Sequence, residues 1–291
     1  MQVMFWGTRG SIPVSGSQFV RHGGSTTCLE IRAGGERIVI DCGTGLAQLG
    51  KECGGELKDI DIYQTHMHWD HVQGFPFFGP LFNPEASVTV HAVNRQGQSM
   101  CDVLNSQMSQ PTFPVGLDII PAALEFDELE QQGVATHGEV TVRWEEVIHP
   151  GGSTAYRFEH DDQVIVFSGD VEVQKGCMEE LIEFSQGADI LIMDSQYFPS
   201  EYVNRQGFGH STPIDAVNVA LQAGVKRLVL THHDPSHDDD KLMEKLELAR
   251  EYAADSGLLV DNAYDGMLLS AKVSEVVPGN HDEEASLKVS A

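Results

Sequence analysis

The sequence predicts a layered α/β or α+β domain rather than an all-parallel sheet. Short apolar segments rich in β-branched or aromatic residues recur along the chain, each bounded by Gly, Pro or Asp, as is typical of strands. Clear helical stretches are few in the first half and more frequent in the second. No Pro/Ser-rich linker divides the chain, so we expect one domain over residues 1–271 and a polar, solvated tail over residues 272–291.

The predicted elements follow from these patterns in chain order. The expected strands are Val3–Trp6, Cys28–Ile31, Arg37–Ile40, Ile60–Tyr63, Val88–Val93, Val140–Trp144, Val164–Phe167, Ile190–Met193 and Leu228–Leu230. The expected helices are Gly45–Cys53, Arg95–Met108, Cys177–Ser185, Pro213–Gln222 and Asp239–Ala254. The helix at Pro213 has the strongest signals, because Thr212 can cap it, proline suits its first position and Asp215 places an acid in its first turn.

The stretch over residues 94–133 shows little strand pattern. One interpretation is a packed surface excursion. The other is a cover over a substrate pocket, because long irregular insertions often serve in this way.

Composition limits the classes of partner. The chain has 291 residues, of which 41% are hydrophobic and 21% charged, as is typical of a globular protein. Lys and Arg number 18 against 44 Asp and Glu, a net charge of −26, so long nucleic acids and anionic membranes are expected to be poor partners. There is no long apolar run, no signal-like N-terminus and no C-x-x-C pair among five cysteines. We therefore expect a reduced, cytoplasmic protein without a membrane segment, and a homo-oligomer remains open.

The strongest chemical signal is T-H-M-H-W-D-H at residues 65–71. It directly follows the alternating strand D-I-D-I-Y-Q, so we expect a loop that leaves a strand end. His66, His68, Asp70 and His71 place four candidate metal ligands within six positions. Imidazole and carboxylate groups suit zinc and other first-row metals.

Further candidates share one position in the predicted fold. His149, Asp170, Asp194 and the pair His232–His233 each lie just beyond the carboxyl end of an apolar strand. Layered α/β proteins tend to build their sites at that edge. Together with the loop at 65–71, these residues supply enough ligands for two metal ions.

In these residues the chain resembles the metallo-β-lactamase-fold hydrolases, whose hallmark is H-x-H-x-D-H followed by a distant His, an Asp and a last His. The resemblance implies a four-layer αββα sandwich and two divalent metal ions. The implied ligands are His66, His68 and His149 for the first metal and Asp70, His71 and His232 for the second, with Asp170 bridging both. His233 is the alternative to His232. Zinc is favoured, and iron or manganese also fit.

Gly209-His210-Ser211-Thr212 resembles the tRNase Z and cyclic-phosphodiesterase branch of these hydrolases. In that branch the His of the H-S-T motif is catalytic and often pairs with an acid at a preceding strand end. Asp194 occupies this position, where tRNase Z typically carries Glu. His210 also precedes a helix N-terminus, whose dipole disfavours imidazolium, and a carboxylate partner would offset that effect.

The expected function is hydrolysis of a small or cyclic phosphodiester by a hydroxide that bridges the two metals. Asp70 would orient the hydroxide, and His210 would protonate the leaving oxygen or stabilise the transition-state anion. The alternatives are a lactone, lactam or thioester hydrolase with the same centre, or a metal-dependent ligand sensor without turnover. The diiron oxidoreductase branch is disfavoured because His68 stands where that branch has Glu. Processing of tRNA is disfavoured because no basic arm is visible.

Arg9, Asp41 and the remaining histidines give weaker signals. Arg9, in a glycine-punctuated loop, is interpreted either as a phosphate-binding group or as part of a structural salt bridge. Asp41 follows a strand and is expected to support the metal loop. The remaining histidines are expected to need no explanation beyond packing and solvent; examples are His91, His137, His160 and His281.

Overall fold

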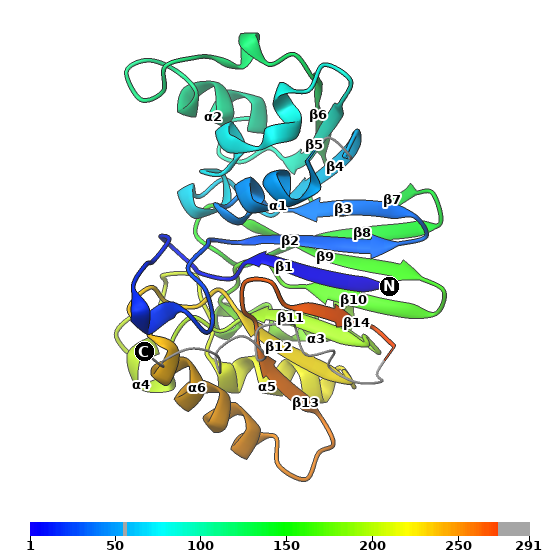
Figure 1. Ribbon diagram of the computed structural model, residues 1–291. Coiled ribbons are helices and arrows are strands. Elements are labelled where there is room, and N and C mark those ends of the chain that lie inside the picture. The colour runs from blue at the N-terminus through cyan, green and yellow to red at the C-terminus, as the bar shows by residue number, and fades with distance from the viewer. Residues whose placement is uncertain (55–56, 273–291) are drawn as a thin grey trace, which may run out of the picture.

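The strands that end at the predicted site bury both of their faces. The computed structural model describes residues 1–54 and 57–272 (Figure 1). Every residue of β11 (Ile190–Asp194) and β12 (Arg227–Thr231) is buried, which explains why these segments are continuous apolar runs without alternation. Residues 273–291 of the predicted tail lie outside the described part of the chain.

Two mixed sheets of seven strands each form the framework. The first has the order β14-β1-β2-β3-β4-β5-β6, with bounds Leu268–Ser270, Gln2–Gly7, Cys28–Ala33, Glu36–Ile40, Asp59–Gln64, Ser87–Val93 and Ala123–Leu129. The second has the order β13-β12-β11-β10-β9-β8-β7, and its remaining strands are Leu259–Asn262, Gln163–Phe167, Ser153–His160, Val140–Val147 and Gly133–His137. In the first sheet, strands from β14 to β3 pair antiparallel and strands from β3 to β6 pair parallel. In the second sheet, strands from β7 to β10 pair antiparallel and strands from β10 to β13 pair parallel.

The helices cover the outer faces of the two sheets. The described helices are α1 (Gly45–Cys53), α2 (Met100–Gln107), α3 (Met178–Phe184), α4 (Pro199–Tyr202), α5 (Pro213–Gln222) and α6 (Asp239–Tyr252). One apolar core lies between the sheets, a second lies between the second sheet and α3, α5 and α6, and a third lies between the first sheet, α1 and α2. The predicted four-layer αββα arrangement is therefore confirmed. Figure 1 shows α2 at one end of the molecule and α6 at the other.

The predicted elements are present, with some corrections. Each predicted strand lies within an observed one, and α5 begins with the expected capping box between Thr212 and Asp215. The helix expected from Arg95 begins instead at Met100, because Ser99 and Asp102 form a capping box there.

The segment over residues 94–133 is more regular than its sequence suggested. It contains α2 and also β6, which pairs in parallel with β5 at the edge of the first sheet. None of the helices in the described residues has the length and apolar character needed to cross a membrane.

Candidate metal centre and active site

The loop after β4 brings several of the predicted ligands inward. The side-chain amide of Gln64 donates hydrogen bonds to the main-chain carbonyls of His66 and His71 at 2.7 and 2.9 Å. These bonds fix the loop from within. The 3-10 helix Trp69–His71 follows and buries Asp70 and His71.

Two groups of side chains converge where the strands end. The groups are His66, His68 and His149, and Asp70, His71, Asp170 and His232. In each group, one candidate ligand atom per residue lies within 4.8 Å of the others. Asp170 lies between the groups, because its Oδ2 is 3.6 Å from Nε2 of His66 and 3.1 Å from Nε2 of His232. All seven predicted ligands are therefore brought together.

Three of these imidazoles donate a hydrogen bond from Nδ1 to an acceptor behind them. The acceptors are the Asp41 carboxylate for His71 (2.7 Å), the Gly209 carbonyl for His149 (2.8 Å) and the Gln196 amide oxygen for His232 (3.0 Å). Each bond fixes the tautomer, so that the Nε2 lone pair of the same ring points into the cluster. This is the form in which histidine binds a metal.

Inside the cluster, nitrogen atoms face one another. Nδ1 of His68 lies 3.0 Å from Nε2 of His149, and the Nε2 atoms of His71 and His232 are 3.3 Å apart. Two lone pairs at this distance repel unless a proton or a cation lies between them.

Two buried atoms of the centre also have no hydrogen-bond partner. They are Nε2 of His66 and Oδ1 of Asp170. Orphaned polar atoms of this kind are costly in a protein interior. Nitrogen and oxygen donors that converge without partners fit divalent first-row metal ions.

The electrostatics of the centre agree with this fit. Burial lowers the pKa of His66 and lowers that of His149 to about 4, so both rings are neutral at pH 7. Burial also disfavours the charged forms of His71 and His232, but Asp170 and its carboxylate neighbours outweigh this effect and raise the pKa of both, that of His232 to about 10. Without a cation, protons balance the carboxylates, and a bound divalent ion would replace these protons.

The predicted partners His210 and Asp194 lie in contact. Nδ1 of His210 donates to Oδ2 of Asp194 at 2.8 Å, and the carboxylate itself is completely buried. The His210 ring stacks on that of His232 with centroids 4.8 Å apart. Since Nδ1 is bonded to Asp194, Nε2 is the nitrogen of His210 that remains available to a reacting group.

Backbone conformation at two site residues is unusual. His232 and Asp41 have φ values of 56° and 63°, a left-handed region that costs energy for residues other than glycine. Space is also restricted, since a Cβ atom on Gly10 would lie 2.3 Å from the His232 ring. The chain thus maintains local strain and close packing around this ligand candidate.

The structure separates His232 from His233. His232 lies in the cluster, whereas Nε2 of His233 donates to the main-chain oxygen of Ala263 at 3.0 Å.

Neither interpretation of Arg9 is correct. Its side chain is completely buried, and it donates to main-chain oxygens of Gly23 and His237 rather than to a carboxylate. The guanidinium therefore holds loops together and does not face the site.

Sequence reasoning missed three supporting residues. Gln196 accepts from His232, and the buried ammonium of Lys245 donates to the main-chain oxygens of Ser195 and Gln196 at 2.9 and 2.8 Å. Glu172 accepts from the main-chain N–H of Gly209 and so fixes the turn before His210. A polar residue two positions beyond a strand end could have indicated Gln196, but nothing in the pattern of α6 distinguishes Lys245 from a solvated lysine.

A second histidine cluster lies between the sheets at the β6 and β7 edge, and we call it the edge cluster. Its members are Asp61, Tyr63, His91, Asp127 and His137. His91 contacts Asp61 at 2.7 Å through Nε2 and Asp127 at 2.9 Å through Nδ1. The expectation that His91 and His137 need no special explanation is therefore wrong.

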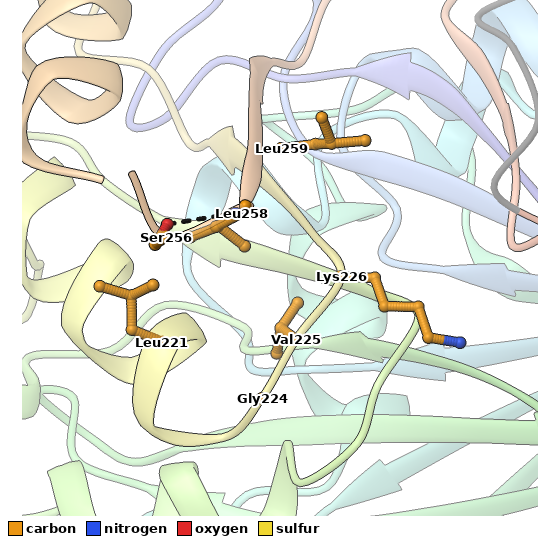
Figure 2. Close-up of a pocket in the computed structure, with 8 residues that line it drawn as sticks. Leu221, Gly224, Val225, Lys226, Ser256, Leu258 and Leu259 are labelled. Carbon is orange, nitrogen blue, oxygen red and sulfur yellow. Dashed lines mark hydrogen bonds between the residues drawn. The ribbon is translucent and has the colours of Figure 1, made fainter. Parts of the chain in front are cut away.

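Several hollows mark the surface, and two border the metal loop. Another, of about 530 Å³, lies between α5 and β13, where Figure 2 shows Leu221, Leu258 and Leu259 around it. This hollow is at the amino end of β12, and Lys226 beside it pairs with Asp189. His232 follows the opposite end of the same strand, so the hollow in Figure 2 is remote from the candidate centre.

Comparison with known proteins places this geometry in context. The family described as beta-lactamase superfamily domain matches residues 36–233. A protein named ribonuclease Z from Haloarcula marismortui is 26% identical over 322 aligned positions, which cover 94% of each chain. A metallo-beta-lactamase fold protein from Bacillus subtilis has a TM-score of 0.69 at 20% identity, over 92% of this chain and 99% of that one. Human tRNase Z, short form, has a TM-score of 0.64 at 23% identity, over 94% and 100%.

Proposed function

Since the chain belongs to the beta-lactamase superfamily, we propose that it is a metal-dependent hydrolase that cleaves phosphodiesters at the centre described above. The observation that carries this proposal is the 2.8 Å contact between His210 and Asp194 beside the converging ligands. Metal ligands alone suit several hydrolytic reactions, whereas a buried, carboxylate-bonded histidine next to them supplies a proton donor for a leaving oxygen. The relative named ribonuclease Z supports phosphodiester chemistry.

We propose that the centre holds two metal ions, with zinc favoured and iron or manganese as alternatives. One ion would be held by His66, His68 and His149, and the other by Asp70, His71 and His232. Asp170 would contribute to both sites. Divalent ions supply Lewis acidity toward phosphoryl oxygens and activate water. Oδ2 of Asp70 accepts a hydrogen bond from the main-chain N–H of Ser11 at 2.6 Å, which orients this carboxylate toward the centre.

His210 would complete the reaction as the proton donor. Asp194 fixes its ring through Nδ1, and Nε2 delivers a proton to the departing oxygen. The carboxylate also holds the ring in the orientation that this role requires.

Contrary to the expectation from the sequence, long nucleic acids are not excluded as partners. That expectation rested on the net charge of −26, but a relative named ribonuclease Z matches along nearly the whole chain. Net charge describes the whole surface, whereas a substrate would meet a centre that bound metal ions would make locally positive. We propose a small or cyclic phosphodiester as the substrate, and RNA is a distinguishable outcome of the test below.

The test is a substrate panel with the metal-loaded protein. The substrates are bis-p-nitrophenyl phosphate, 2′,3′- and 3′,5′-cyclic nucleotides, a precursor tRNA with a 3′ extension, and a lactone. We expect hydrolysis of at least one small phosphodiester and none of the lactone. Lactone hydrolysis alone, or no turnover with metal bound, would overturn the proposal in favour of the carbonyl hydrolase or the sensor.

A pair of variants links any activity to the centre. With a cyclic nucleotide, whose leaving alkoxide requires a proton, His210→Ala should lower turnover by about 10²- to 10⁴-fold, the usual contribution of a general acid. His160→Ala is the matched control, because His160 lies outside both histidine clusters. Equal activity of the two variants would show that the proposed proton donor is wrong.

A further inference from the structure

A hollow of about 690 Å³ opens beside the metal loop. Its walls come from that loop, from the 3-10 helix Phe75–Phe77, from α2 and from the turn that follows α2. The lining residues are Met67, Trp69, Val72, Gln73, Pro76, Phe77, Gln98, Val103, Ser106, Gln107, Thr112 and Phe113. Part of the segment 94–133 thus forms a wall of a pocket next to the candidate centre.

Two aromatic side chains of this pocket are unusually exposed. Trp69 is 74% exposed and Phe77 is 64% exposed, although both are large and apolar. Phe113 packs edge to face against Phe77, with ring centroids 5.8 Å apart. Exposed aromatic side chains gathered around a concavity are typical of a binding site.

The polar groups of the pocket are neutral. The lining contains neither Lys and Arg nor Asp and Glu, although the chain as a whole is strongly acidic. Three glutamines supply amide groups instead. Gln107 donates to the main-chain oxygen of Val72 at 3.2 Å, while its Oε1 atom is buried without a hydrogen-bond partner.

The aromatic pocket lies next to the loop that carries His66 and His68. A smaller hollow of about 270 Å³ adjoins it, and Met67, Gln98 and Val103 line both. His66 and His68 line the smaller hollow as well. A ligand whose phosphate lies at the candidate metal ions can therefore extend a second group into the aromatic pocket.

We propose that this pocket binds the base of a nucleoside phosphodiester, with Phe77, Trp69 and Phe113 as its stacking surface. The inference rests on the proposed function and names the substrate class for the same centre. Bases stack on aromatic side chains whatever their sequence, and amide groups bond to base edges. A base is planar and uncharged at pH 7, which matches a pocket lined by aromatic rings and neutral amides. A lipid or acyl chain would match the rings but not the amides.

The first experiment compares two phosphodiesters with the same leaving group. Thymidine 5′-(p-nitrophenyl phosphate) carries a base, whereas methyl p-nitrophenyl phosphate does not. In the metal-loaded protein, Phe77→Ala should lower kcat/KM about tenfold for the thymidine ester and leave the methyl ester unchanged, as expected from the loss of one stacking partner. Phe82→Ala is the matched control, because Phe82 is 45% exposed in the next 3-10 helix and does not line the pocket.

The outcomes separate this inference from the proposed function. If both esters are hydrolysed but Phe77→Ala affects them equally, the base pocket is wrong and the phosphodiesterase proposal stands. If neither ester is hydrolysed, the phosphodiesterase proposal fails for these substrates, and the pocket is decided by binding alone.

The second experiment measures that binding directly. Trp6 and Trp144 are buried, so quenching of tryptophan fluorescence by an added ligand reports mainly on Trp69. Adenosine 5′-monophosphate should quench the emission and bind at least about tenfold more tightly than ribose 5-phosphate, and Phe77→Ala should remove the difference. Equal affinity for the two compounds, or tighter binding of a fatty acyl phosphate, would overturn the proposal.

Discussion

The candidate metal centre and the edge cluster are built from the same residue types, yet their contacts differ. In the metal centre, ring nitrogens approach ring nitrogens at 3.0 and 3.3 Å, and buried atoms of His66 and Asp170 have no partner. In the edge cluster, both nitrogens of His91 contact carboxylate oxygens, at 2.7 and 2.9 Å. The first arrangement leaves donor atoms that fit a bound cation, whereas in the second the contacts between imidazole and carboxylate are already made.

Position in the fold explains this difference. The ligand candidates follow strand ends, where a loop frees each side chain to turn toward a common point. Asp61, His91 and Asp127 instead lie within neighbouring strands β4, β5 and β6, and their spacing is set by the sheet. Cross-strand neighbours of opposite charge pair with one another. A count of histidines and acids therefore does not identify a metal site, but the direction of their lone pairs does.

The largest expected effect comes from removing one histidine of each cluster. His68→Ala should lose the first metal ion and reduce phosphodiester turnover by more than about a hundredfold, since even changes to residues behind the ligands cost 10- to 100-fold. His91→Ala should leave the metal content unchanged. Metal analysis of the purified, loaded proteins measures both. Two metal ions per chain in His68→Ala, or loss of metal in His91→Ala, would contradict the distinction between the clusters.

The second effect concerns the carboxylate behind His210. Asp194→Asn should lower kcat by about 10²-fold or more, because the imidazolium loses its charge partner while an amide keeps much of the shape. The pH profile of kcat should change as well, which a purely structural role would not produce. Asp189→Asn is the matched control, since Asp189 is also buried and lies just before the same strand, β11, where it pairs with Lys226. Unchanged turnover in Asp194→Asn would refute the dyad.

The strand-end rule explains why so much of the site was predictable. Asp170, Asp194, His149 and His232 lie at or shortly after the end of an apolar run, and the structure brings them together because β8, β10, β11 and β12 run in the same direction and end at one edge. The supporting contacts were not predictable in this way. Arg9 resembled a phosphate-binding group in a glycine-rich loop, but it is buried against main-chain oxygens.

The fold was predictable where strands are buried on both faces. The prediction failed for strands that are exposed at a sheet edge. Central strands such as β11 and β12 are buried on both faces and are recognisable as apolar runs. The strands that were missed include β6, whose sequence A-L-E-F-D-E-L is acidic and largely exposed at a sheet edge. β6 forms because it pairs with β5, which is distant in sequence. The local pattern of apolar and polar residues does not reveal such a pairing.

The smallest expected effect is a pH-dependent contribution of the edge cluster to stability. Burial alone lowers the pKa of His91, but its bonds to Asp61 and Asp127 outweigh burial and raise that pKa above its usual value. Burial alone would raise the pKa of Asp61, but the imidazoles of His137 and His91 outweigh burial and hold this pKa well below its usual range. Tyr63 and His137 are the other titratable groups that face this network. The cluster therefore stabilises the fold above the pKa of an unfolded Asp, about 3.9, and below that of an unfolded His, about 6.5.

His91→Gln should accordingly reduce the free energy of unfolding by about 1–2 kcal/mol near pH 6, which is below the full value of a hydrogen bond to a charged group because water screens the half-exposed Asp127. The difference from the unmodified chain should shrink as the pH rises above 6.5 and through the raised pKa of His91, because the imidazole loses its proton in the folded state as well. Urea unfolding between pH 6 and 10 measures this difference, and His160→Gln controls for loss of a histidine outside the cluster. A difference that stays constant over this range would mean that the edge cluster acts through packing, not through the proton that distinguishes it from the metal centre.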